Sequence, residues 1–312
     1  MADPTDARGP AAGAGMLVKR PRDLIAAGLV LASIGRAPAS ADDACPGLFA
    51  DGRVPVLTNP KLAVRTVPLC FEAFAVLHSG VTRTPLYAAE HLTRGSVAEA
   101  RAVARDDSFH EESRLPPDAR ASLEDYVRSG FDRGHLAPAG DMPTVSAQAE
   151  SFTLANVVPQ NRVLNRGLWA DIEEGVRRLA TRRGSVFVVT GAIFAGDAVQ
   201  QIKGGVLVPT QLFKALYDPE TGQAGAYLAP NDGSRDWRTV PIDDLTRASG
   251  IDVFPGLPAA ARTAALTLPE PDASAHSGAH RPRREETWQD WLQREGSRVL
   301  RKLVHDVLRA IF

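Results

Sequence analysis

The chain has 312 residues, 44% of them hydrophobic and 23% charged, with a formal net charge of −1 at pH 7. These values are ordinary for one large globular domain with additions at its ends. A net charge near zero excludes capture of a polyanion through overall charge, so a nucleic-acid site would have to gather positive charge locally. Most basic residues are arginine, which suits bidentate phosphate contacts, although a compositional bias would give the same excess.

Residues 1–41 have the pattern of a Sec-type signal peptide. Basic residues precede an apolar run at 24–34, and the small residues at 39–41 predict cleavage after Ala41. The apolar run is too short for a permanent membrane anchor. We therefore expect a periplasmic or secreted protein. A disordered leader with a chance apolar patch is the other reading, and Met16 is an alternative start.

The chain contains two cysteines, Cys45 and Cys70, both shortly after the expected cleavage site. An even number of cysteines in an exported chain favours one disulfide that closes the loop between them. Neither cysteine has a histidine with an asparagine or aspartate nearby in the sequence, so a catalytic thiol is not indicated.

Two strand-like runs at 71–78 and 85–92 flank a turn at 79–80 and predict a hairpin. The polar stretch 93–120 reads as a long irregular loop, which inside a domain is usually functional or disordered. Further strands are expected at 185–191, 206–209, 211–217 and 225–228, with a turn at 218–222 and a short closing helix within 241–253.

The stretch 131–142, with the sequence FDRGHLAPAGDM, carries the strongest chemical signal. It places a possible general base, His135, next to the charged pair Asp132 and Arg133 and to a flexible glycine. A second polar cluster follows, with Asn165 and Glu173. One imidazole, one carboxamide and one carboxylate would suffice for metal-assisted hydrolysis of a phosphodiester.

The spacing in 146–156 predicts a helix that leads into a short strand, and 165–181 predicts a longer helix. Asn165, Trp169 and Glu173 recur every four residues on one face of the longer helix, so Asn165 and Glu173 are aimed at the same place. By itself Asn165 would also suit a helix N-cap. Glu173 could be an ordinary solvated residue, and Trp169 suits the core better than a platform for bases.

Residues 268–286 are rich in Pro, Ala, Ser, His and Arg without periodicity, and therefore read as a linker. Residues 287–312 form one predicted amphipathic helix with basic side chains beside an apolar stripe. The sequence leaves three roles for this helix: docking on the core, formation of a homodimer, or contact with a membrane surface.

The motif at 132–139, DRGHLAPA, resembles the signature of the DNA/RNA non-specific endonucleases, the ββα-metal superfamily that includes mitochondrial endonuclease G. The downstream blocks at 156–160 (NVVPQ) and 165–169 (NRGLW), followed by Glu173, are similar to the second block of that family in order and spacing. The resemblance covers roughly 45–260 and implies an endonuclease domain at 42–267. It implies an α+β fold with a central antiparallel sheet flanked by helices, to which the C-terminal amphipathic helix is added.

The resemblance also implies roles for individual residues. His135 would take a proton from the attacking water, and Asn165 would be the only direct protein ligand of one hydrated Mg²⁺, with Mn²⁺ as the alternative. Glu173 would hold water around the ion. Hydrolysis would leave 5′-phosphate ends on DNA or RNA.

Substrate contacts are implied for Arg133 and for an arginine in the preceding loop, where Arg101 ahead of Asp106 is the first choice and Arg105 the alternative. Asp132 and Asn156 complete the expected substrate-binding set, Asp132 by orienting the loop and Asn156 by supporting the His135 region.

Two other functions are possible for the same scaffold: a catalytically silent protein that binds nucleic acid, and an envelope protein that interacts through its terminal helix. The intact set of His135, Asn165 and Glu173 favours the enzyme.

Overall fold

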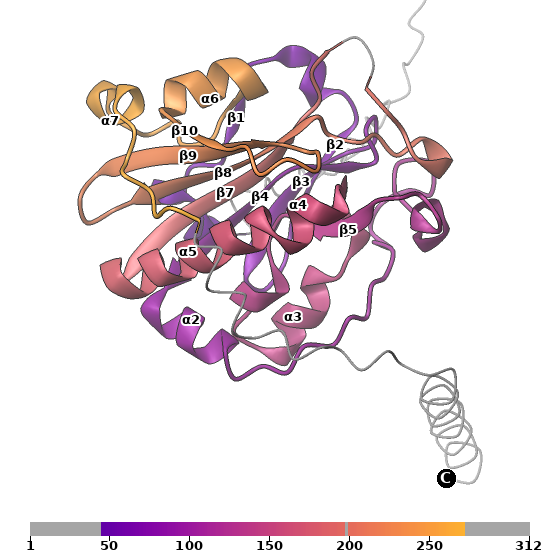
Figure 1. The fold of residues 1–312 in the computed structure, drawn as a ribbon, viewed down its shortest axis with the longest axis horizontal. Coiled ribbons are helices and arrows are strands. Elements are labelled where there is room, and N and C mark those ends of the chain that lie inside the picture. The colour runs from indigo at the N-terminus through magenta and orange to yellow at the C-terminus, as the bar shows by residue number, and fades with distance from the viewer. Residues whose placement is uncertain (1–44, 197–198, 272–312) are drawn as a thin grey trace, which may run out of the picture. The chain divides into compact units, whose positions relative to one another are not determined.

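A seven-stranded antiparallel sheet forms the centre of the computed structural model, which describes residues 45–196 and 199–271 (Figure 1). The strand order is β10-β9-β8-β7-β4-β3-β2. The strands are β2 (Thr66–Cys70), β3 (Phe74–Ser79), β4 (Thr84–Thr93), β7 (Ser185–Ile193), β8 (Gln211–Asp218), β9 (Gln223–Pro230) and β10 (Arg238–Val240). The expected α+β class with a central antiparallel sheet is therefore confirmed.

Two short antiparallel pairs lie outside this sheet. One pairs β1 (Val56–Leu57) with β11 (Ile251–Asp252), and the other pairs β5 (Asp132–His135) with β6 (Val157–Gln160). The second pair contains the motif that the sequence singled out, so the candidate site is built beside the main sheet and not within it.

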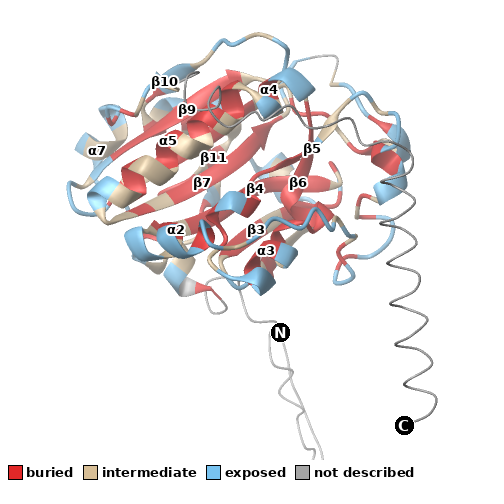
Figure 2. Ribbon diagram, turned by 60° about the horizontal axis from the view of Figure 1, so that its bottom comes forward, coloured by how far each residue is buried: buried red, intermediate tan, exposed pale blue. Residues whose placement is uncertain are grey.

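Side chains of the central strands are buried on both faces, as the red strands in Figure 2 show. On β8 the residues alternate: Leu212 and Leu216 pack into one hydrophobic cluster, whereas Phe213 and Ala215 pack into another. Because side chains of a strand point alternately to opposite faces, this pattern requires cover on both sides of the sheet.

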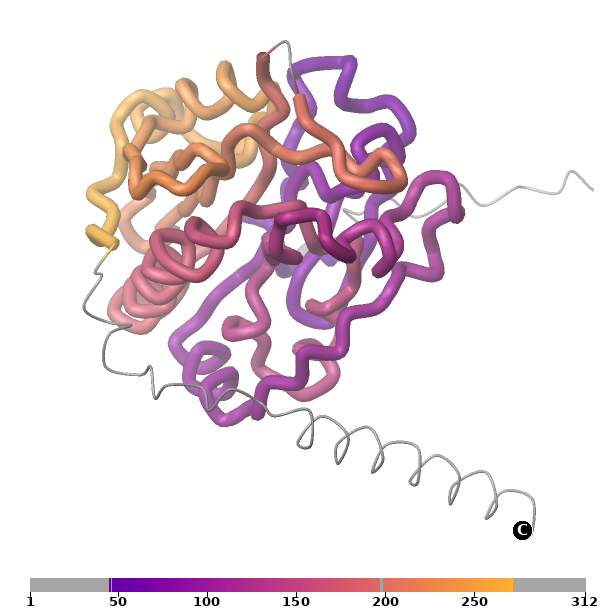
Figure 3. Tube along the Cα trace, turned by 45° about the vertical axis from the view of Figure 1, so that its right-hand side comes forward, coloured from indigo at the N-terminus to yellow at the C-terminus, as the bar shows by residue number. Residues whose placement is uncertain are grey.

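Helices supply that cover. The first cluster contains Trp169 and Ile172 from the long helix α5, and the second contains Ile242 and Leu245 from α6. The helices are α2 (Arg94–Ala100), α3 (Val145–Ser151), α4 (Arg162–Arg166), α5 (Leu168–Arg183), α6 (Ile242–Ser249) and α7 (Ala259–Thr263). In Figure 3 the segment between α2 and α4, in magenta, runs along the side of the fold away from α6 and α7, in orange and yellow.

The stretch 93–120 is not wholly irregular, as the sequence suggested, because it begins with α2. Thr93 caps this helix: its side chain accepts a hydrogen bond from the backbone of Ser96, and the Ser96 side chain accepts one from the backbone of Thr93. Such a capping box starts a helix even where the following residues have no clear periodicity.

The single helix expected at 165–181 is two helices. The first, α4, is capped by Asn161, so the interpretation of Asn165 as an N-cap is wrong. Gly167 has φ −119° and ψ −106° and interrupts the helix, and a Cβ there would lie 2.9 Å from the carbonyl oxygen of Val163. The break separates Asn165 on α4 from Glu173 on α5.

The strand expected at 206–209 is also absent. Leu207 makes one isolated bridge to Gln201, and the backbone amides of Leu207 and Val208 donate to Thr82 and Gln200 outside any sheet. The apolar run is buried in a loop instead, since Val206 and Val208 belong to a small third hydrophobic cluster with Tyr126.

Contact with the core continues past residue 267, where the linker was expected to begin. Leu268 is buried, and the hydroxyl of Tyr227 donates to the carbonyl oxygen of Pro269 at 2.6 Å. None of the helices within the described ranges combines the length and apolar character needed to cross a membrane. The expected signal peptide, most of the linker and the C-terminal helix lie outside the described residues.

Candidate active site

The candidate site is built from β5, β6 and the helices α4 and α5 that follow, a strand–strand–helix unit. Gly134 lies opposite Val158 in the β5–β6 pair. A Cβ on Gly134 would come within 2.0 Å of Oε1 of Gln160, whose side chain is fully buried. Only glycine fits between Arg133 and His135, which explains the third residue of the DRGH motif.

His135 is buried, with its ring against two phenylalanines. Its centroid lies 5.2 Å from that of Phe109 and 4.9 Å from that of Phe152, the latter in an edge-on arrangement. Among the described residues its Nε2 atom has no hydrogen-bond partner. Burial, followed by the positive charge of Arg105, lowers the pKa of His135 to about 3. The imidazole is therefore neutral near pH 7 and has a nitrogen free to accept a proton.

Beside His135 is a cavity of about 290 Å³, which we call the catalytic cavity. His135, Asn165, Glu173, Arg105, Arg133 and Arg177 are among the residues that line it. The structure thus brings together the imidazole, the carboxamide and the carboxylate that the sequence selected. His135 comes from β5, Asn165 from α4 and Glu173 from α5, whereas the sequence had predicted one helix for both Asn165 and Glu173.

Glu173 is a half-buried carboxylate in this cavity. Burial raises its pKa to about 7, against the opposing effect of Lys214 and Arg177, while Asp141 raises it further. Arg177 is held by an ion pair to Asp141 at 2.8 Å. Glu173 therefore lies in a network of charges and not on a solvated helix face, and it titrates near neutral pH.

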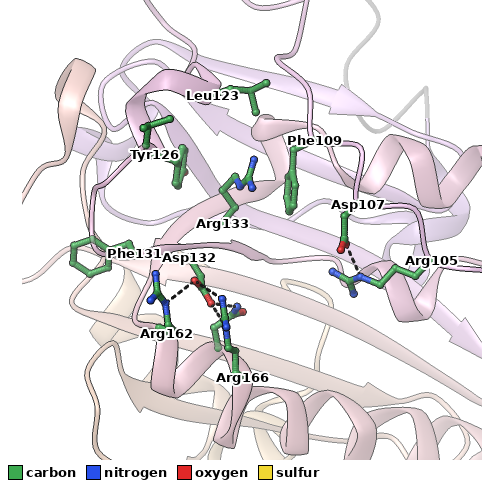
Figure 4. A pocket seen from close by; sticks show the side chains of 12 residues that line it. Arg105, Asp107, Phe109, Leu123, Tyr126, Phe131, Asp132, Arg133, Arg162 and Arg166 are labelled. Carbon is green, nitrogen blue, oxygen red and sulfur yellow. Dashed lines mark hydrogen bonds and ion pairs between the residues drawn. The ribbon is translucent and has the colours of Figure 1, made fainter. Parts of the chain in front are cut away.

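Asn165 is oriented by a hydrogen bond from its Nδ2 to Asp132 at 3.1 Å. Asp132 also accepts two hydrogen bonds from Arg166, at 2.7 and 3.1 Å, and one from Arg162 at 3.2 Å (Figure 4). Burial opposes ionisation of Asp132, but the hydrogen bonds from Arg166 and Asn165 outweigh it and lower the pKa of the carboxyl. Asp132 is thus an anchor for Asn165, which agrees with the expected orienting role.

Two of the arginines that line the cavity, Arg133 and Arg105, lie over phenylalanine rings. The guanidinium of Arg133 lies 4.2 Å from the ring centroid of Phe109, and that of Arg105 lies 5.4 Å from Phe152. Arg105 also pairs with Asp107 at 2.7 Å. These stacked cations are suited to phosphate, which they would meet without first leaving a buried ion pair.

The structure does not bring Arg101, the preferred loop arginine, to the site. Arg101 is exposed at the end of α2 and lines neither the catalytic cavity nor its larger neighbour, whereas Arg105 lines both. The course of the chain after α2 has no periodic signal in the sequence, so the choice between the two arginines required the fold.

Asn156 is likewise corrected as a substrate-binding residue. It is fully buried; its Oδ1 accepts from the Ala137 amide at 3.0 Å, and its Nδ2 donates to the carbonyl oxygens of Ala137 and Ser151. These bonds leave it no surface for a nucleic acid, and they fix the segment directly after His135. The expected supporting role is the one that the structure shows.

The sequence analysis did not single out a lysine that is buried next to the site. Lys214 on β8 is fully buried, donates to Oγ1 of Thr190 at 2.6 Å and reaches the carbonyl oxygen of Leu136 at 3.5 Å. The signal was present: Lys214 occupies an inward position between Leu212 and Leu216 in an alternating strand. A charge at such a position is costly to bury unless it has a partner or a function.

The cavity can accommodate a hydrated divalent ion. Because Nδ2 of Asn165 is engaged with Asp132, its Oδ1 is the atom available to an ion, and Mg²⁺ prefers such oxygen ligands and retains several waters. Within the described part of the chain no three His, Cys, Asp or Glu residues cluster closely enough to hold a metal by themselves. An ion here could use Oδ1 of Asn165, with water and substrate as further ligands.

Comparison with known proteins agrees with this site. The family model for DNA/RNA non-specific endonuclease matches residues 57–260. Nuclease C1 of Cunninghamella echinulata var. echinulata is 33% identical over 204 residues, which cover 59% of this chain and 81% of that protein. Human mitochondrial nuclease EXOG is 33% identical over 210 residues, covering 60% of this chain and 57% of that protein.

A solved structure is similar as well. A chain in the crystal structure of the EndoG/EndoGI complex superimposes with a TM-score of 0.55 at 28% identity, over 59% of this chain and 84% of that chain. The mitochondrial nuclease of Saccharomyces cerevisiae is 31% identical and is matched over 65% of its length. The chain thus spans less than two thirds of human EXOG and of the yeast nuclease. The stretch matched by the family model, 57–260, contains the site and the seven-stranded sheet.

Proposed function

Because the chain belongs to the DNA/RNA non-specific endonuclease family, with the ββα-metal nuclease fold, we propose that it hydrolyses phosphodiester bonds of DNA and RNA with a divalent metal ion and His135 as general base. The observation that carries the proposal is the Nε2 atom of His135. That nitrogen is buried and has no hydrogen-bond partner among the described residues, and His135 lines a cavity that also contains Asn165 and Glu173.

In this mechanism His135 accepts the proton of the attacking water at Nε2. Its low pKa keeps the ring neutral before substrate arrives. The same burial and the nearby Arg105 and Arg133 disfavour the imidazolium that forms. A phosphate bound by these two arginines would offset their charge, so that the proton affinity of His135 rises when substrate is in place.

Asn165 would hold the metal ion through Oδ1, with Asp132 fixing the side chain. When bound, a divalent ion stabilises negative charge on the phosphate and on the leaving oxygen. Glu173 would hydrogen-bond water in the same cavity. Departure of the 3′ oxygen leaves 5′-phosphate ends.

Contacts of this kind involve phosphate and not base edges, which favours hydrolysis of DNA and RNA with little sequence preference. Mg²⁺ is the proposed ion, with Mn²⁺ as the alternative, because the available protein ligand is one neutral oxygen.

We further propose that the protein is exported to the periplasm or secreted. The leader at 1–41 supports this, as does the disulfide between Cys45 and Cys70, since such bonds persist mainly in oxidising compartments. Fractionation of cells that express the full chain, with N-terminal sequencing of the product, tests it: a mature start at Asp42 supports export, whereas an intact leader in the cytoplasm contradicts it.

The activity is tested with the purified full chain on plasmid DNA and on RNA, in Mg²⁺, in Mn²⁺ and in EDTA. We expect both substrates to be cleaved, EDTA to abolish cleavage, and His135→Ala to reduce the rate by at least about 100-fold. His110→Ala is the matched control, because His110 is exposed and lines neither cavity. A folded wild-type chain that binds nucleic acid without cleaving it would replace the enzyme by a silent binding protein.

A further inference from the structure

A second, larger cavity of about 500 Å³ adjoins the catalytic cavity, and we call it the flanking cavity. The two cavities share Arg105, Arg133 and Asn165. A substrate strand held at the shared arginines can therefore extend from one cavity into the other. Apart from these three residues and Asp132, the catalytic mechanism gives the residues of the flanking cavity no role.

One wall of the flanking cavity is cationic. Arg162 and Arg166 both pair with Asp132 (Figure 4), yet their side chains remain 60% and 67% exposed. Two guanidinium groups share one carboxylate, so this wall keeps a net positive charge. In its hydrogen bond to Asp132, Arg162 uses its Nε, so its terminal amino groups are available for a phosphate.

The opposite wall is apolar. Val127 is 54% exposed and Leu123 is 38% exposed, and both line the flanking cavity. Single exposed apolar side chains are common on protein surfaces. Here two of them border the same cavity, and Figure 4 shows Leu123 across from Arg162 and Arg166. Such a lining suits a nucleotide, in which an anionic phosphate is joined to a flat, apolar base.

We propose that the flanking cavity binds the nucleotide next to the scissile phosphate, with its own phosphate on Arg162 and Arg166 and its sugar and base against Val127 and Leu123. This subsite rests on the proposed function, because the strand must first be held at Arg105 and Arg133. It is independent of sequence, since an apolar wall accepts the face of any base.

The test measures binding and not turnover. In a His135→Ala background, the affinity of the full chain for a fluorescent single-stranded oligonucleotide is measured by anisotropy over a range of salt concentrations. We expect Arg162→Ala to weaken binding about fivefold or more and to reduce the slope of log K against log salt by about 0.7, the value for one lost phosphate contact. Val127→Ser should weaken binding roughly threefold to fivefold without changing the slope.

An abasic oligonucleotide, which has phosphates and sugars but no bases, distinguishes the contribution of the arginines from that of the apolar side chains. With it, the effect of Val127→Ser should disappear while the effect of Arg162→Ala remains. Arg101→Ala and Val145→Ser are matched controls, because both residues are exposed and line neither cavity. Thermal unfolding of each variant verifies that it is folded.

The possible results separate the subsite from the enzyme. If wild type cleaves nucleic acid but neither variant changes the affinity or the salt slope, the proposed subsite is wrong and the proposed endonuclease activity is unaffected. The flanking cavity would then bind something else, such as a protein partner. Weaker binding of Arg162→Ala at an unchanged slope overturns the phosphate assignment. Absence of cleavage by wild type contradicts the proposed function itself and is seen in a different assay.

Discussion

Asn165 and Asp132, which lie 33 residues apart in the chain, are joined by a hydrogen bond of 3.1 Å from the Asn165 amide to the Asp132 carboxylate. The bond crosses from α4 to β5 and determines which atom of the carboxamide faces the catalytic cavity. Without it the amide group could rotate and present Nδ2, which cannot bind a cation.

Asp132→Ala should therefore weaken the response to metal. We expect the Mg²⁺ concentration for half-maximal cleavage to rise about 10–100-fold, as is typical when a partner that orients a metal ligand is removed. A titration of plasmid cleavage with Mg²⁺ measures this. Asp118→Ala, which removes an exposed pair with Arg65, is the control, and an unchanged Mg²⁺ response in Asp132→Ala would contradict the orienting role.

Gly134→Ala should destabilise the β5–β6 pair, because the added methyl group would overlap the buried side chain of Gln160. Overpacking of this kind costs about 1–3 kcal/mol of unfolding free energy, and cleavage should fall as His135 moves with its strand. Urea unfolding measures the stability. Gly233→Ala is the control, since nothing lies within 4 Å of a Cβ there; equal stability of both variants would show that β5 can shift without cost.

The low pKa of His135 predicts a dependence of stability on pH. The folded pKa, about 3, lies below the ordinary value of 6.5, so between these values the unfolded chain carries a proton that the folded chain does not. The free energy of unfolding should therefore fall as the pH drops from 6.5 toward 3, by at most about 1.4 kcal/mol per pH unit from this residue.

Burial lowers the pKa of His78 as well, so the slope that belongs to His135 is the difference between wild type and His135→Asn. Urea unfolding at several pH values gives both slopes, and His110→Asn, at an exposed position outside both cavities, is the control. A slope that His135→Asn does not reduce would mean that His135 can be protonated in the folded state.

Protonation of Glu173 should cause the decline of activity on the acid side of the pH profile, which we call the acid limb. Its raised pKa, about 7, means that the carboxylate is increasingly protonated below neutral pH. We expect kcat/KM to decline below about pH 7 in wild type, whereas Glu173→Gln should have a lower activity that does not vary over this range. The limb should also move to lower pH as Mg²⁺ is raised, because a nearby cation favours the ionised carboxylate. A limb that persists in Glu173→Gln would assign it to another group.

The disulfide between Cys45 and Cys70 joins a buried residue of the N-terminal segment to β2 and closes a loop with a sequence separation of 25. Closing a loop of that length restricts the unfolded chain and is worth about 3 kcal/mol. Urea unfolding with and without a reductant should show a loss of this order. A Cys45→Ala/Cys70→Ala variant should be insensitive to reductant, and equal stability of reduced and oxidised wild type would contradict the prediction.

Much of the fold could be predicted from local patterns. The hairpin of β3 and β4, the strands β7, β8 and β9, and the buried face of α5 follow from hydrophobic periodicity, which the structure confirms. Errors arose where a local feature replaced periodicity: the capping box at Thr93, the break at Gly167 and the loop hydrogen bonds around Leu207. Each depends on one or two residues, through a side-chain cap, a backbone conformation or a loop hydrogen bond, and a pattern averaged over many residues does not detect it.

By itself the sequence determined which residues to look for in the candidate site, namely His135, Asn165, Glu173 and Arg133, which line one cavity, and which cysteines form the disulfide. Only the tertiary structure decided that Arg105 and not Arg101 faces the cavity and that Asn156 is a buried support. The physical reason is that residue type and spacing encode which groups can react. Which cation reaches a cavity, and how far burial moves a pKa, depend instead on packing between segments distant in the chain.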